Sequence, residues 1–197
     1  MIALPAGPAP VRRTTLFVGA AFASAAMAAF FAGLIALYIQ QRHAAGGSTK
    51  EWLPEKVGIP MVPANTMLFV LLGASIMAQW AVHAMRRGIR RDTITALTLT
   101  GLLGVATLNA QSFIWAQMKL PILSEKGQAY NTMFFTVTGA FFAAVIAGII
   151  LTVIGAFRSL AGPPGPDATE GVSVIALYWH VLFGVFCFVW LVVYVVK

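Results

Sequence analysis

The sequence predicts an all-α integral membrane protein, a bundle of five transmembrane helices in a single membrane domain over residues 1–197. Of its 197 residues, 59% are hydrophobic and only 10% are charged, whereas a soluble domain carries about 25% charged residues. Five apolar runs are each long enough to cross a hydrocarbon core about 30 Å thick at about 1.5 Å per residue. The short alternating segments that are typical of a membrane β-barrel are absent from the sequence.

The first run covers residues 14–40 and follows Arg12 and Arg13. A basic start before apolar residues also describes a secretory signal peptide, and Ala-Ser-Ala at 23–25 resembles a cleavage site. The run stays apolar to Ile39, which is well past a signal core of about 7–15 residues. We therefore expect a retained transmembrane helix.

The other runs alternate with short polar linkers that carry nearly every charge. They cover residues 64–85, 93–118, 130–157 and 174–196. Pro63 directly precedes the second run, as expected near a helix start. The linker at 161–166 reads Ala-Gly-Pro-Pro-Gly-Pro, which cannot be helical. No linker is long enough to hold a soluble domain.

The linker between the second and third runs is a tight basic turn with two interpretations. It contains Arg86, Arg87, Arg90 and Arg91. With these four included, the two sides of the membrane carry almost equal totals of Lys and Arg, 7 and 6, so the position of the short turn decides the orientation. Because short loops rich in Lys and Arg stay inside the cell, this turn predicts a cytoplasmic N-terminus and a periplasmic, outside C-terminus. The alternative interpretation, compatible with the first, is a binding site for an anionic phospholipid.

Small residues recur every four positions in two of the runs. The sets are Ala21, Ala25, Ala29 and Gly33 in the first run, and Gly139, Ala143 and Ala147 in the fourth. Small residues at this spacing let helix backbones approach closely in lipid. We expect them to pack helices within this chain, and a dedicated contact with another chain is the alternative.

Polar side chains inside the runs are few, and none is acidic or basic at depth. Transporters and channels usually need titratable or ion-coordinating groups there, so the sequence argues against that class. Asn109 and Gln111 are expected to form hydrogen bonds between helices. His83 and His180 lie at different depths, which argues against paired haem ligation, and Cys187 is expected to be an inert apolar residue.

Five short motifs occur in order along the runs. They are Phe-Phe-Ala-Gly-Leu at 30–34, Asn-Thr-Met-Leu at 65–68, Ser-Ile-Met-Ala-Gln-Trp-Ala at 75–81, Phe-Phe-Thr-Val-Thr-Gly at 134–139 and Ala-Leu-Tyr-Trp-His at 176–180. Together they resemble subunit III of haem–copper (cytochrome c) oxidases in its short, five-helix bacterial form. The resemblance extends over all five runs.

The sequence departs from this family at its buried polar positions. Many relatives carry acidic residues where this chain has Met27, Ile114 and Phe183, and paired histidines where it has Phe141 and Ala144. The family's buried polar network is therefore largely replaced by apolar residues. These departures put in doubt any proton-linked role of those positions.

The resemblance implies a non-redox accessory subunit of a respiratory oxidase in a bacterial inner membrane. It implies direct contact with oxidase subunit I, assembly with subunit II, bound phospholipid, and support for oxygen reduction and proton pumping. Haem and copper belong to the partner subunits, and no catalytic, cofactor-binding or metal-binding residue is expected in this chain. An accessory subunit of a nitric oxide reductase is one alternative, and a small transporter or channel, which the absence of buried charge disfavours, is the other. The candidates for contact with lipid or a partner subunit are Gln79, Arg86, Arg87, Arg90, Arg91, Trp179 and His180.

Overall fold

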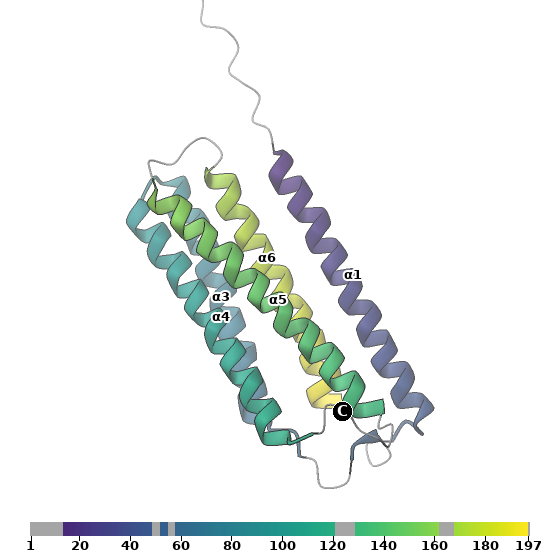
Figure 1. Ribbon diagram of the computed structural model, residues 1–197. Helices are drawn as coiled ribbons and strands as arrows, with labels where there is room; N and C mark the ends of the chain where they lie inside the picture. The colour runs from purple at the N-terminus through teal and green to yellow at the C-terminus, as the bar shows by residue number, and fades with distance from the viewer. Residues whose placement is uncertain (1–13, 49–51, 55–57, 121–128, 162–167, 197) are drawn as a thin grey trace, which may run out of the picture.

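The computed structural model describes residues 14–48, 52–54, 58–120, 129–161 and 168–196, and these form a bundle of long helices (Figure 1). The helices are α1 (Thr15–Ala44), α3 (Met61–Arg86), α4 (Arg90–Met118), α5 (Ala129–Leu160) and α6 (Ala168–Val189), and α6 continues as the π-helix η1 (Trp190–Val196). Five helical segments are long and apolar enough to cross a membrane. The predicted all-α fold with five spanning helices is therefore confirmed.

The helices contain the predicted runs and extend beyond most of their ends. α3 begins at Met61, so Pro63 lies inside its first turn, where a proline is tolerated because the first amides have no partner within the helix. α6 begins at Ala168, six residues before the predicted start. Hydropathy detects only the part of a helix inside hydrocarbon, whereas helical hydrogen bonding continues into the polar interface.

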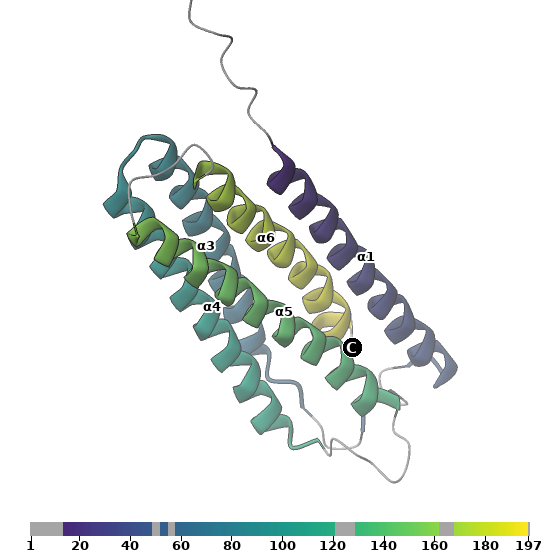
Figure 2. The same cartoon turned by 45° about the horizontal axis from the view of Figure 1, so that its top comes forward.

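The helix α1 lies at the edge of the bundle, while α6 lies between α1 and α3 (Figures 1 and 2). α1 packs on α6 and α5. Its buried residues are Ser24, Phe31 and Tyr38, which are seven residues apart and therefore share one narrow face of the helix. Met27, Ala28, Leu34 and Ile35 are half-buried and pack beside this face, and most other residues of α1 are exposed.

The two predicted small-residue stripes do not pack helices within this chain. Ala21, Ala25, Ala29 and Gly33 are all exposed on α1. On α5, Ala143 and Ala147 are exposed, and a Cβ placed on Gly139 would meet no atom within 4 Å. The expectation was therefore wrong for contacts inside the chain, because the larger residues on the opposite faces make those contacts.

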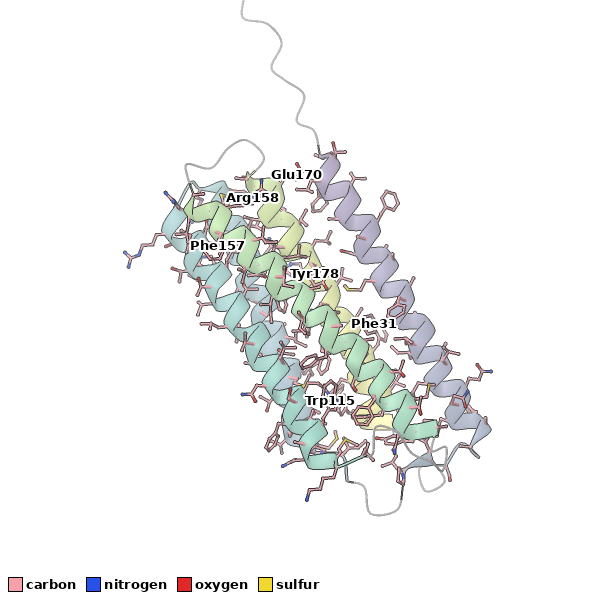
Figure 3. All side chains as sticks on the ribbon, viewed as in Figure 1. Phe31, Trp115, Phe157, Arg158, Glu170 and Tyr178 are labelled. Carbon is pink, nitrogen blue, oxygen red and sulfur yellow. The ribbon has the colours of Figure 1, made fainter. Side chains whose placement is uncertain are left out.

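The close packing depends on other glycines, which receive the aromatic side chains of α6. A Cβ on Gly104 of α4 would lie 2.7 Å from the ring of Trp179, and one on Gly148 of α5 would lie 2.9 Å from the ring of Tyr178. Tyr178 also donates its hydroxyl to the carbonyl of Ala144 (2.7 Å). Figure 3 shows Tyr178 at the middle of the bundle.

Two threonines of α5 accept hydrogen bonds from tryptophans of neighbouring helices. Trp115 of α4 donates its indole N–H to Thr138 (3.1 Å), and Trp179 of α6 donates to Thr152 (2.8 Å). Each threonine hydroxyl donates in turn to the carbonyl four residues earlier in α5. Each hydroxyl is thus both donor and acceptor, which keeps these polar groups satisfied inside an apolar bundle.

The end of the bundle opposite the arginine turn holds a second set of interhelical hydrogen bonds. From η1, Tyr194 donates its hydroxyl to Gln111 of α4 (3.0 Å), and Trp190 donates its indole N–H to Asn65 of α3 (2.9 Å). The expected interhelical bond of Gln111 is therefore confirmed. Asn109 instead lies exposed on α4, because residues two apart on a helix cannot face the same neighbour.

Gly148→Ala should destabilise the protein, because its new methyl group overlaps the rings of Tyr178 and Trp179. Overpacking typically costs about 1–3 kcal/mol, which lowers the melting temperature by about 2–10 °C for a chain of this size. Gly139→Ala on the same helix is the matched control and should be neutral or stabilising, since its Cβ would meet no atom within 4 Å. Thermal unfolding in mild detergent measures both, and equal melting temperatures would contradict the prediction.

Candidate functional site

The arginine turn is fixed by its backbone. Gly88 adopts a φ of +73°, which L-residues with a side chain rarely adopt. The amide of Ile89 donates to Ala84 (3.0 Å), and that of Gly88 donates to Met85 (3.0 Å). This pair of bonds is the Schellman motif that ends many helices, so α3 stops here and α4 begins directly at Arg90.

The side chain of Arg90 caps the end of α5. Its Nε donates to the carbonyl of Ser159 (2.7 Å), and its guanidinium also donates to the carbonyl of Leu160. The last carbonyls of a helix have no partner within the helix and carry partial negative charge, so a cation is favoured there. Arg90 therefore links the turn to α5 and has fewer donors left for a lipid than its neighbours.

The other arginines of this end are exposed. Arg86, Arg87 and Arg91 surround the turn, and Arg158 lies near the end of α5. Figure 3 places Arg158 at the same end of the bundle as Glu170. Together with Arg90, five cations thus lie at one end of the bundle, with Asp92 in the first turn of α4 beside them.

The predicted residues Gln79 and His180 lie together on the outside of the bundle. His180 of α6 forms a hydrogen bond through Nδ1 with the hydroxyl of Ser75 and through Nε2 with Oε1 of Gln79 (3.2 Å). Ser75 and Gln79 are one turn apart on α3, and Ser75 is buried while Gln79 and His180 are exposed. Ser75 was not among the predicted contact residues, although its spacing of four from Gln79 places both on one face of the helix.

Trp179 differs from the other candidates in its position. It is fully buried between α4, α5 and α6, with its indole N–H bonded to Thr152. Such a side chain reaches neither lipid nor a partner, so the structure assigns it to packing inside the chain. From sequence, its place beside His180 gave no sign of which of the two faces inward.

The residues at the family's missing polar positions take part in apolar packing. Ile114 is fully buried. The centroid of the Phe141 ring lies 4.8 Å from that of Phe186 and 6.4 Å from that of Phe31. Within the described ranges, no group of three His, Cys, Asp or Glu side chains could hold a metal ion. Both ring nitrogens of His180 are also engaged by Ser75 and Gln79.

Glu170 forms a contact between two helices that the sequence did not predict. Its carboxylate accepts a hydrogen bond from the backbone amide of Phe17 (2.7 Å), so one side chain joins the first turns of α1 and α6. A carboxylate is favoured at both positions by the positive end of each helix. An acidic residue just before an apolar run was the available signal, but nothing in the sequence pointed to α1 as its neighbour.

Comparison with known proteins agrees with this architecture. The family model described as "Cytochrome c oxidase subunit III" matches residues 17–197. The chain belongs to the cytochrome c oxidase subunit III family. This membership gives it an accessory role in an oxidoreductase complex. Its five spanning helices and its similarity to bacterial subunits 3 indicate a multi-pass protein of a bacterial inner membrane.

Individual subunit III relatives match along most of the chain. A cytochrome c oxidase subunit 3 of Corynebacterium diphtheriae is 28% identical over 151 residues, which cover 77% of this chain and 73% of the relative. A probable subunit 3 of Mycobacterium bovis is 26% identical over 168 residues, covering 85% and 81%. That of Rickettsia conorii is 31% identical over 145 residues, covering 72% of this chain but 48% of the longer relative.

Arg90→Gln should lower stability by about 1 kcal/mol, because it removes a charged cap from the last carbonyls of α5. Arg91→Gln removes the same charge from an exposed side chain of the same turn and should change stability little. Differential scanning fluorimetry in detergent would show a melting temperature lower by about 2–4 °C for Arg90→Gln alone. Similar values for the two variants would show that the cap does not stabilise α5.

Proposed function

We propose that this subunit III is a non-redox scaffold of its oxidase. In this proposal it contacts subunit I directly, assembles with subunit II and holds anionic phospholipid at the arginine turn. It thereby supports oxygen reduction and proton pumping by the partner subunits, which carry the haem and copper. Family membership supports the accessory role, and the apolar packing at Ile114 and Phe141 supports a structural contribution by this chain.

The exposed arginines carry the lipid part of the proposal. Arg86, Arg87 and Arg91 surround a turn between two membrane-spanning helices, so in this proposal their side chains lie at the level of the lipid headgroups. Each cation near an anionic membrane surface contributes about 1 kcal/mol of attraction. Arginine also binds phosphate through two parallel hydrogen bonds, which favours a phospholipid headgroup as the ligand.

The same turn supports the proposed orientation. Four arginines lie within six residues at the junction of α3 and α4, and short loops with this charge remain on the cytoplasmic side. The bundle then has its N-terminus in the cytoplasm and its C-terminus outside. The phospholipid site accordingly faces the inner leaflet, where anionic lipids are found.

The double variant Arg86→Ala, Arg87→Ala should lose bound anionic lipid. Removal of two cations worth about 1 kcal/mol each weakens binding by about 30-fold. Native mass spectrometry of the purified complex counts the retained phospholipids. Lys119→Ala, at the opposite end of α4, is the control and should keep its lipid. Unchanged lipid in the double variant would reject the site.

Affinity purification in mild detergent tests membership of the oxidase. Subunits I and II should co-purify with a tagged form of this chain, and the preparation should show haem absorption and contain copper. Mass spectrometry of the partner subunits separates an oxidase from a nitric oxide reductase. A pure preparation that contains neither haem nor oxidase subunits would contradict the proposed function.

A further inference from the structure

Gln79 and His180 place polar atoms on the outer surface of the bundle, two or more helical turns from the nearer ends of α3 and α6. Gln79 lies seven residues before Arg86, which corresponds to about 10 Å along the helix axis. His180 lies twelve residues after the start of α6, or about 18 Å. Both depths fall within a hydrocarbon core about 30 Å thick.

The hydrogen bonds of this cluster determine which donors remain unused. Because Oε1 of Gln79 accepts from Nε2 of His180, that ring nitrogen carries the proton. Nδ1 is then an acceptor, and the hydroxyl of Ser75 donates to it. The network ends at Gln79, whose carboxamide NH₂ has two further N–H donors that these bonds do not use.

An amide donor at this depth needs an acceptor. Water is scarce in hydrocarbon, and an unsatisfied N–H is correspondingly costly there. Phosphate headgroups lie at the ends of the helices and not at their middle. The acceptor must therefore come from a group that itself lies within the membrane.

The surface beside the cluster has room for a helix. Gly184 follows His180 by one turn on α6, and a Cβ placed on it would meet no atom within 4 Å. Ile76 and Trp80 flank Gln79 on α3 and are 53% and 38% exposed. A glycine between larger residues permits close approach of a second helix backbone, which strengthens both packing and hydrogen bonds in lipid.

We propose that Gln79 and His180 form a docking site for a transmembrane helix of another oxidase subunit. That helix carries a carbonyl, hydroxyl or carboxylate oxygen that accepts a hydrogen bond from the Gln79 carboxamide. Its backbone passes over Gly184. This inference rests on the proposed function, because it requires that the chain is assembled with other membrane subunits.

Gln79→Leu tests the donor in the assembled complex. Leucine has a similar size but no donor, so the retention of this subunit on a tagged oxidase partner should fall by about three- to twenty-fold during detergent washing. The control is Gln117→Leu, the same change at an exposed glutamine near the end of α4, which should leave retention unchanged. Immunoblots of membranes before solubilisation show whether each variant is inserted at the normal level.

Photo-crosslinking identifies the occupant of the site. A benzoylphenylalanine at Ile76, beside Gln79, should form a product with another oxidase subunit in native membranes, identified by mass spectrometry. Lipid adducts alone would overturn the inference, as would equal retention of Gln79→Leu and Gln117→Leu. If the wild-type chain fails to co-purify with haem-containing subunits, the proposed function itself fails, so the two failures are distinguishable.

Discussion

The bundle depends on how helices attract one another where apolar burial supplies little driving force. Lipid tails are as apolar as leucine, so close packing and interhelical hydrogen bonds must hold the helices together. Trp179 provides both at one point, because its ring lies against Gly104 and its indole N–H bonds to Thr152. One residue thus joins α4, α5 and α6, and the neighbouring Tyr178 adds a bond to Ala144.

The same constraint explains why α1 differs from the other helices. It contributes a single narrow face to the bundle, and at the arginine-turn end the carboxylate of Glu170 binds its first turn. Near its other end, Tyr38 accepts a hydrogen bond from Trp52 (3.0 Å). The small residues Ala25 and Gly33 on its outer face remain available to surroundings outside this chain.

The two candidate contact regions follow different physical rules because they lie at different depths. Around the arginine turn, water and headgroups solvate exposed charge. Arg86 and Arg87 can therefore remain exposed without a bound lipid at little cost in free energy. Below the headgroups water is scarce, and the hydrogen bond between His180 and Oε1 of Gln79 leaves the N–H donors of the Gln79 carboxamide unused by this network. An exposed arginine at the turn is therefore simply accessible to lipid. An exposed Gln79 within the membrane instead has N–H donors that require an acceptor.

The sequence by itself determined the membrane class, the five spans and the family, because long apolar runs and ordered motifs need no knowledge of neighbours. It also located the arginine turn, where Gly88 and four arginines lie close together along the chain. Only the tertiary structure decided that Arg90 caps α5, that Trp179 faces inward and that the stripe through Ala25 faces outward. A run that is apolar on every side carries no signal for its buried face, so the rotation of each helix is fixed only when its neighbours are in place.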